Sequence, residues 1–277
     1  MRTVVLAPKK FDVAGVHCIV TGGSSGIGKE VAKQLAREGA DVTLVARDKA
    51  KLKEAQGEVW GCAQREGQRV ETVSVDLSGS FKAVKEALDA AVEKLGDAEV
   101  LVNCAGYSTP LEFDAMEVEE YDRLLRVNTL GTMYPTRALL PRMKAWRRGR
   151  IVIVSSMCGQ MGSYGFTAYS ASKFALVGLA QALQMEVHAH GVGVSVAYPP
   201  DTLTPGYDKE NQIKPEVTHK ISADGGVFTA ENVASDIVCG MKRGSFSITM
   251  GAEGWFLAAG TAGFAPCFSV VESIGQV

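Results

Sequence analysis

The stretch VHCIVTGGSSGIG, residues 16–28, decides the fold of this 277-residue chain. Its first five residues form an apolar run that is typical of a short buried strand. The glycine-rich turn TGGSSGIG follows and opens a helix, which we expect over about 27–38 with Gly39 as its end. A strand, a glycine turn and a helix in this order suit a pyrophosphate, because the glycines let the backbone approach it and the helix N-terminus offers free N–H groups.

Strands and helices alternate along the rest of the chain. This pattern predicts an α/β fold of the Rossmann type, a doubly wound parallel sheet in a three-layer α/β/α arrangement. We expect the segment 199–227 to be a loop, and its length indicates a functional one. Further strands are predicted at 41–46, 70–75, 99–103, 150–155, 192–197 and 246–250. Further helices are predicted from an Asp48 cap towards Arg65 and over 80–95, 118–144, 168–188 and 229–241. The helix over 118–144 is expected to be interrupted near Gly131 and Pro135, and Thr229 is expected to cap the last helix.

Composition limits the class of protein. With 46% apolar and 22% charged residues, the chain can bury the core of one domain, which we place at 1–251. The net charge of -2 leaves no basic stripe for a phosphate backbone, so the sequence predicts no nucleic-acid partner. The six cysteines have no metal-like spacing and are interpreted as reduced thiols, and no metal is expected. The first residues are expected to be neither a signal peptide nor a membrane span.

The stretch TAYSASK, residues 167–173, carries a tyrosine and a lysine four residues apart. On a helix this spacing puts Tyr169 and Lys173 on one face, where an ammonium can stabilise a phenolate. Ser156 lies thirteen residues before the tyrosine, at the end of the apolar run IVIVSS. Successive strand residues point to opposite faces, so only one of Ser155 and Ser156 can face a cleft, and the spacing favours Ser156.

Together with an NCAG turn at 103–106, these motifs resemble the short-chain dehydrogenase/reductase family from about Gly15 to about Gly251. The resemblance implies reduction of a carbonyl by hydride from a nicotinamide cofactor. Tyr169 then donates the proton, and Ser156 hydrogen-bonds the same oxygen. Lys173 lowers the pKa of the tyrosine and holds the nicotinamide ribose. Asn128, in RVNTLGT, matches the residue that anchors a water in the proton path.

Arg47 stands about twenty residues after the glycine turn, where an acidic residue would hold the ribose hydroxyl of NAD. An arginine there favours NADPH, because it can bind a 2′-phosphate through charge-assisted hydrogen bonds. Lys51 can add a donor, whereas adjacent Asp48 keeps NAD possible, although its simplest role is helix capping. Further cofactor contacts are expected at Gly22, Ser24, Ser25, Gly26, Ile27 and Gly28, and, as the resemblance implies, at Asp76, Leu77, Asn103, Ala105, Gly106, Tyr169, Lys173, Pro199, Thr202 and Thr204.

Two readings from other classes remain. Gly22, Ser24 and Gly26 also spell GxSxG, the nucleophile elbow of a hydrolase, which would need a late histidine such as His188, His190 or His219. That reading leaves the serine, tyrosine and lysine set unexplained. The chain can also be an NADPH-binding scaffold without catalysis, but its intact set of catalytic residue types argues against this.

The run YPPDT, residues 198–202, departs from the more usual PGxVxT of the superfamily. It resembles the branch of the family that reduces 3-ketodihydrosphingosine, a long-chain amino ketone of sphingolipid synthesis, on the cytosolic face of the endoplasmic reticulum membrane. Within that resemblance Asp201 either meets the substrate ammonium or, as the simpler interpretation, caps the loop. Steroid ketones or other lipid ketones are the alternative substrates.

The C-terminal extension, 252–277, has a different character. Residues 254–271 pass without a charge but contain glycines and a proline, so they predict either a subunit-facing segment or a surface in peripheral contact with a membrane. The helices predicted over 118–144 and 168–188 are apolar on more than one face. This pattern, with the family resemblance, predicts a homodimer or homotetramer.

Overall fold

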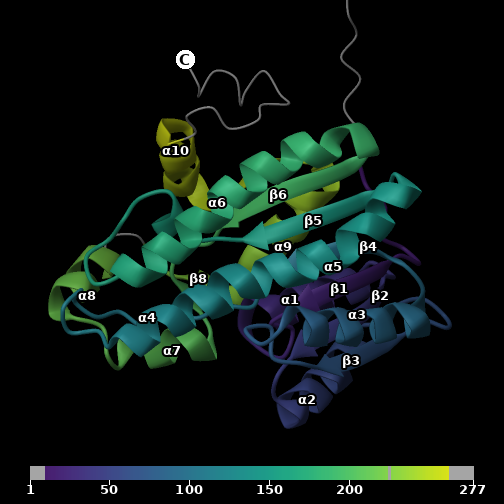
Figure 1. Ribbon diagram of the computed structural model, residues 1–277, viewed down its shortest axis with the longest axis horizontal. Coiled ribbons are helices and arrows are strands. Elements are labelled where there is room, and N and C mark those ends of the chain that lie inside the picture. The colour runs from purple at the N-terminus through teal and green to yellow at the C-terminus, as the bar shows by residue number, and fades with distance from the viewer. Residues whose placement is uncertain (1–9, 224–225, 262–277) are drawn as a thin grey trace, which may run out of the picture.

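A seven-stranded parallel sheet forms the middle layer of the protein (Figure 1). The computed structural model describes residues 10–223 and 226–261. The strand order is β3-β2-β1-β4-β5-β6-β9, and every neighbouring pair is parallel. The predicted doubly wound α/β fold is therefore confirmed. The strands are β1 (His17–Thr21), β2 (Asp41–Ala46), β3 (Val70–Ser74), β4 (Ala98–Asn103), β5 (Gly149–Val154), β6 (Val192–Tyr198) and β9 (Ser247–Thr249).

Helices cover both faces of the sheet, and each face has its own apolar core. Side chains of α1, α2 and α9 pack on one face, and those of α3, α5 and α6 pack on the other. Strands buried on both faces lack polar alternation, which explains why their sequences are almost continuously apolar. The helices are α1 (Gly26–Arg37), α2 (Lys49–Trp60), α3 (Phe81–Leu95), α5 (Gly131–Trp146), α6 (Thr167–Val187) and α9 (Ala230–Arg243).

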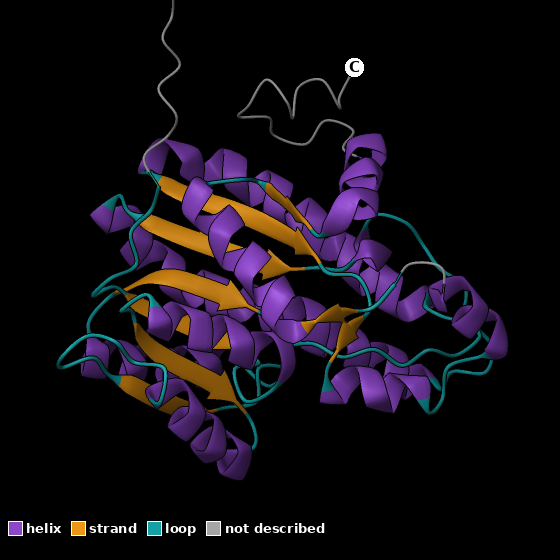
Figure 2. Cartoon of the chain, turned by 180° about the vertical axis from the view of Figure 1, so that it is seen from behind, coloured by secondary structure: helices purple, strands orange, loops and turns teal. Residues whose placement is uncertain are grey.

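The strand order reverses at β1, which lies between β2 and β4. In such sheets the crevice beyond the carboxyl ends of the strands is where ligands bind. Two further helices, α7 (Pro205–Asn211) and α8 (Glu216–Ala223), lie beyond these strand ends, and both views of the chain agree on this (Figures 1 and 2).

The segment 199–227 is not the open loop that we expected. It contains α7, α8 and the short strand β7 (Thr202–Leu203), which pairs with β8 (Phe228–Thr229). The Thr204 hydroxyl caps α7 by accepting a hydrogen bond from the N–H of Tyr207 at 3.1 Å. The polar composition of the segment concealed these two short helices.

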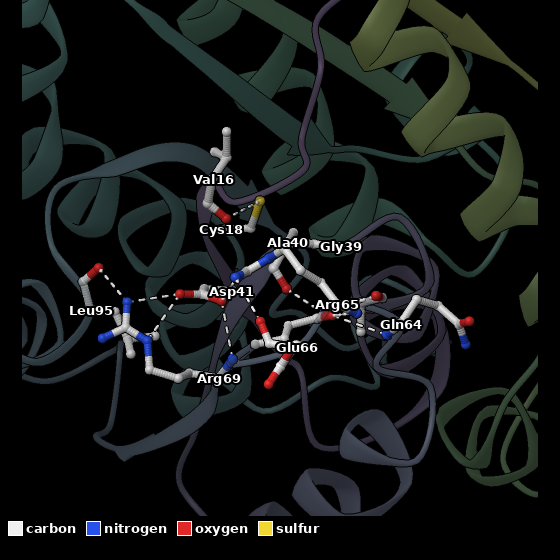
Figure 3. Close-up of polar contacts among 12 residues, drawn as sticks. Val16, Cys18, Gly39, Ala40, Asp41, Gln64, Arg65, Glu66, Arg69 and Leu95 are labelled. Atoms are coloured by element: carbon white, nitrogen blue, oxygen red, sulfur yellow. Dashed lines mark hydrogen bonds and ion pairs between the residues drawn. The ribbon is translucent and has the colours of Figure 1, made fainter.

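The helix after β2 also ends earlier than predicted. It stops at Trp60 because the chain turns back, and Arg65 contacts the sheet instead of continuing the helix. Asp41, at the start of β2, is buried and accepts from the Arg65 and Arg69 guanidinium groups at 2.5 and 2.8 Å (Figure 3). This carboxylate joins β2 to the turn before β3 at the edge of the sheet away from the crevice.

The predicted helical region 118–144 is interrupted, but not by its proline. It consists of α4 (Val118–Leu125), one π-helical turn (Arg126–Leu130) and α5, and Pro135 lies inside α5. The π-helical turn carries Asn128. Its side-chain amide donates a hydrogen bond to the hydroxyl of Ser172 in α6. The predicted Thr229 cap of α9 is confirmed, since its hydroxyl accepts from the N–H of Asn232 at 3.2 Å.

Part of the apolar tail is helical. The helix α10 (Gly251–Thr261) begins at the end of the domain that we delimited from the sequence. The rest of the tail, 262–277, lies outside the described residues. Among the helices that the structure describes, none combines the length and apolar character needed to cross a bilayer.

Candidate active site

Two turns meet beyond the carboxyl ends of β1 and β4. The Thr21 hydroxyl accepts hydrogen bonds from the backbone N–H groups of Cys104 and Ala105, at 3.1 and 3.2 Å. A Cβ on Gly22 would lie 2.9 Å from the Cα of Ala105, so a glycine is needed for this close approach. The TGGSSGIG and NCAG turns are therefore packed as one unit.

The glycine turn leaves the start of α1 open for a ligand. Gly22 and Gly26 adopt positive φ angles of 67° and 55°, and a Cβ on Gly28 would lie 2.5 Å from the carbonyl oxygen of Gly22. Ser25 occupies the N-cap position, yet its side chain makes no capping hydrogen bond. The first N–H groups of this helix are thus available for a phosphate, and the turn fits the pyrophosphate of a dinucleotide. The neighbouring turn residues Ser24 and Ile27 are both half-buried.

Arg47 follows β2 at the edge of this turn. Its side chain is exposed, and its guanidinium forms no ion pair with the residues that the structure describes. Asp48 is the N-cap of α2 and accepts from the N–H groups of Ala50 and Lys51 at 3.0 and 3.1 Å, so the capping role is confirmed. The carboxylate of Asp48 is engaged by its own helix, and Arg47 remains available to bind an anion.

Asp76, Leu77 and Asn103 line the neighbouring strand ends. The Asp76 carboxylate accepts from the N–H and hydroxyl of Ser78, at 2.9 and 2.6 Å. Burial acts to raise the pKa of Asp76, but these hydrogen bonds, together with the charges of Arg47 and Arg123, outweigh it and hold the pKa below its usual value. Leu77 is buried, and Asn103 donates to the Thr136 hydroxyl at 3.0 Å, which ties β4 to α5.

The structure brings Ser156, Tyr169 and Lys173 together. Tyr169 and Lys173 lie one turn apart in α6, with the Lys173 Nζ 5.5 Å from the centre of the tyrosine ring. That ammonium donates to the carbonyl of Val154 at 3.0 Å. Ser156 is the N-cap of the short helix Met157–Gly159, where its hydroxyl accepts from the N–H of Cys158 at 3.2 Å, and it is close enough to Tyr169 to act on the pKa of that hydroxyl. The serine and tyrosine hydroxyls can therefore bind one carbonyl oxygen.

Ser155 faces the other way. Its side chain is buried, and its hydroxyl donates to the carbonyl of Lys173 at 3.0 Å, within the protein interior. The alternation of strand side chains thus separates the two serines as expected. Ser155 holds the backbone of α6 against β5, and of these two serines Ser156 is the one beside the Tyr169 hydroxyl.

The ionisation of the pair depends on its burial. Burial raises the pKa of Tyr169 above its ordinary value, and the hydrogen bond with Ser156 opposes this rise without cancelling it. Burial also lowers the pKa of Lys173 to about 8. Burial therefore dominates the pKa of Tyr169 in this arrangement, and the lowering by Lys173 stays a prediction. Tyr169 remains protonated at neutral pH, and this is the form that can donate a proton to a ketone oxygen.

Asn128 is fully buried in the π-helical turn. Its amide accepts from the N–H of Tyr107 at 3.0 Å and donates to the carbonyl of Tyr107 and the hydroxyl of Ser172, both at 3.0 Å. A Cβ on Gly106 would lie 3.0 Å from the Asn128 Oδ1 and 3.4 Å from the Lys173 Nζ. Asn128 therefore joins the NCAG turn to α6 beside the catalytic lysine.

The segment after β6 closes over the glycine turn. The carbonyl of Pro199 accepts from the N–H of Met157 at 3.2 Å, next to Ser156. The Thr204 methyl lies 3.0 Å from where a Cβ on Gly26 would stand. The Thr202 hydroxyl is buried and donates to the carbonyl of Pro200 at 2.8 Å. Pro199 and Thr204 are therefore placed to border a cofactor at this turn.

Sequence reasoning missed three residues near the site. Phe166 packs on Tyr169 with ring centres 5.7 Å apart, and Lys214 and Glu210 from the α7–α8 segment form an ion pair close by. A glutamate and a lysine four residues apart are usually interpreted as a solvated helix pair. Nothing in the local pattern distinguishes this pair, whose lysine is buried where the segment packs against residues 164–166, just before α6.

The hydrolase reading fails on the placement of its histidines. Ser24 follows the carboxyl end of β1, whereas His188 and His190 precede β6 and lie at the amino ends of the strands. His219 is exposed on α8, and no hydrogen bond links it to Ser24 within the described residues. The geometry supplies no general base for a serine nucleophile at this turn.

A parallel doubly wound sheet with a glycine turn at its switch point and a serine, tyrosine and lysine beyond it defines an oxidoreductase that uses a nicotinamide cofactor. The family model described as short chain dehydrogenase matches residues 16–214, and the chain belongs to this family.

Two relatives are similar over the full chain. The chain is 47% identical to a 3-ketodihydrosphingosine reductase of Bos taurus and 46% identical to a 3-dehydrosphinganine reductase of Danio rerio, covering 83% of each relative. Among solved structures, it resembles a metagenomic short-chain oxidoreductase in complex with NADP, with a TM-score of 0.63 and 33% identity. That match covers 69% of this chain and 85% of the other.

Proposed function

We propose that this protein reduces the ketone of 3-ketodihydrosphingosine to the alcohol sphinganine, with NADPH as reductant, in sphingolipid synthesis. The observation that carries the proposal is the grouping of Ser156, Tyr169 and Lys173 beyond the strand ends, in a chain that is 45–47% identical to curated reductases of this name. The YPPDT segment borders the same site and supports this substrate over other ketones.

The chemistry follows from the side chains. Ser156 and Tyr169 bind the ketone oxygen, and the tyrosine hydroxyl donates its proton as that oxygen gains negative charge. The Lys173 ammonium, near the ring of Tyr169, stabilises the phenolate that remains. When bound, the nicotinamide supplies the hydride. Asn128 holds the turn and α6 in register, so that the three groups keep their spacing.

The preference for NADPH rests on Arg47. Its guanidinium is exposed beside the glycine turn, and the nearest acidic residue in sequence, Asp48, is engaged in capping α2. An exposed guanidinium at this place matches a 2′-phosphate, while the Asp48 carboxylate, which could hold the ribose hydroxyl of NAD, is engaged by its own helix.

The substrate assignment is tested by turnover of the purified protein with NADPH. The panel consists of 3-ketodihydrosphingosine, steroid ketones and short unbranched ketones. We expect the amino ketone to be reduced with a kcat/KM at least about tenfold above the others, since each mismatched contact costs on the order of 1 kcal/mol or more. Activity confined to the steroid ketones would contradict the assignment.

We also propose peripheral contact with the cytosolic face of the endoplasmic reticulum membrane. Exposed apolar side chains on α8 and α10 support it, among them Val217, Ile221, Trp255 and Phe256. The expected result is flotation of the purified protein with phospholipid vesicles and weaker flotation of the Trp255→Ser, Phe256→Ser double variant. Equal recovery of both proteins in the vesicle-free fraction would argue against a membrane surface.

A homodimer or homotetramer is proposed as well. The outer face of α6 exposes Phe174 and Met185, and neighbouring α5 exposes Met133, so an apolar surface is left outside the sheet layer. Sedimentation velocity should give the mass of two or four chains. A single-chain mass at micromolar concentration would contradict the proposal.

A further inference from the structure

A buried lysine connects the substrate segment to the catalytic helix. Lys214 lies between α7 and α8, and its side chain has no exposed surface. Its Nζ is 2.9 Å from Glu210 Oε1 and 3.5 Å from Asp201 Oδ2. Its Nζ also donates to the Ser222 hydroxyl at 3.5 Å, and the rings of Tyr207 and Phe166 have their centroids 4.9 and 5.9 Å from it.

The two carboxylates around Lys214 are unequally satisfied. Glu210 has the closer contact with the lysine and also accepts a hydrogen bond from the Ser108 hydroxyl, and 12% of its side chain is exposed. Asp201 has only the longer lysine contact, and 27% of its side chain is exposed. No backbone N–H of the described residues donates to this carboxylate, so the expected loop cap is absent.

One negative charge is therefore left over. Two carboxylates face a single ammonium, and Asp201 is the more distant and the more exposed of the two. A carboxylate can accept several hydrogen bonds, and the Oδ1 atom of Asp201 has no donor among the described residues. A partly buried, unbalanced carboxylate is costly unless a cation binds to it.

The excess charge lies near the reacting groups. Asp201 comes two residues after Pro199. The carbonyl of Pro199 accepts a hydrogen bond from the N–H of Met157, the residue after Ser156. Phe166, which packs on Lys214, also packs on the ring of Tyr169. Burial is the main cause of the raised pKa of Tyr169. The negative charges of Glu210 and Asp201 raise this pKa further, so both carboxylates are close enough to influence the hydroxyl.

We infer that Asp201 binds the ammonium group that a 2-amino ketone carries next to its reacting carbonyl, and that Lys214 is a positioning residue that holds Asp201 and Glu210 over Tyr169. This inference rests on the proposed function. It explains how the same site distinguishes an amino ketone from a ketone without an amino group. The substrate ammonium supplies the cation that Asp201 lacks. Lys214 neutralises Glu210 and keeps the segment packed on Phe166.

The first test replaces Asp201 by asparagine, which keeps the shape and removes the charge. The kcat/KM of wild type and variant is measured for 3-ketodihydrosphingosine and for a ketone of equal chain length without the amino group. We expect the amino ketone to lose about 10- to 100-fold, mainly through KM, because a hydrogen bond to a charged group is lost. The plain ketone should change less than about threefold. An equal loss for both ketones, or none for either, would overturn the inference.

Lys214→Met separates positioning from recognition. This variant should lower kcat for both ketones, because the segment loses its anchor, while the preference for the amino ketone persists. The assigned roles would be contradicted if Lys214→Met lost the preference for the amino ketone while Asp201→Asn kept it. The matched control is Glu216→Gln, since Glu216 is an exposed acid of the same segment that pairs with Lys220, and its substitution should change neither parameter.

A binding measurement keeps the two proposals distinguishable. Binding of a long-chain 2-amino alcohol and of the alcohol without the amino group is compared for the NADPH-loaded wild type and Asp201→Asn. Wild type should prefer the amine, and the variant should not. If wild type reduces no amino ketone, the proposed function fails, and this comparison still decides the role of Asp201. Thermal unfolding of each variant verifies that it is folded.

Discussion

Replacing Tyr169 by phenylalanine is expected to lower kcat by about 10²- to 10⁴-fold, the range in which a positioned general acid contributes. The change removes the one hydroxyl that can protonate the ketone oxygen, and it leaves the ring packed against Phe166. NADPH binding, measured by fluorescence titration, should stay within about threefold of wild type, because the glycine turn and Arg47 are untouched. Steady-state turnover of the amino ketone gives the loss.

Tyr164→Phe is the matched control for this variant. Tyr164 lies in the loop before α6, is 44% exposed, and donates its hydroxyl to Glu112 at the surface. Its substitution should leave kcat within about twofold, since a surface hydrogen bond to a carboxylate contributes little. If Tyr169→Phe retained turnover within tenfold of wild type, another group must donate the proton, and the assignment of the acid would be wrong.

Replacing Arg47 by alanine is expected to reduce kcat/KM for NADPH by about 10- to 100-fold, because the charge-assisted hydrogen bonds to a 2′-phosphate are lost. The kcat/KM for NADH should change less than about threefold, since NADH has no phosphate there. The test is the ratio of kcat/KM for NADPH to kcat/KM for NADH, measured with one ketone at saturating concentration. This ratio should fall in the variant.

Lys53→Ala serves as the control for Arg47→Ala. Lys53 is another exposed cation, on α2, and it forms no ion pair within the part of the chain that the structure describes. It should leave both coenzymes unaffected, which separates a local phosphate contact from a general effect of net charge. Equal weakening of NADPH and NADH by Arg47→Ala would mean that Arg47 supports the fold of the turn and not the phosphate.

Much of the site could be predicted because the relative positions of its residues follow from how few residues separate them in the sequence. Tyr169 and Lys173 share a face since they are four residues apart on a helix, and Ser155 and Ser156 are separated by the alternation of a strand. The capping roles of Asp48 and Thr229 follow from their places before helices. These relations need only the local backbone, and the local sequence specifies it.

Predictions failed where contacts span long distances along the chain. The pKa of Tyr169 depends on the burial of its hydroxyl and on the charges of Asp201 and Glu210, which lie more than thirty residues further along the chain. The helix after β2 ended early because Arg65 contacts Asp41 across the turn. The π-helical turn that carries Asn128 is likewise a tertiary feature, held by hydrogen bonds to Tyr107 and Ser172.

The sequence by itself determined the class of fold, and it predicted the place of the cofactor and the residues for reduction, because each depends on residue type at a fixed local spacing. Only the tertiary structure decided that Lys214 is buried, that Asp201 caps nothing and that Asp201 and Glu210 share one ammonium. The physical reason is that charge balance and burial are sums over neighbours in space. Those neighbours come from β4, α6 and the α7–α8 segment, which meet only when the chain is folded.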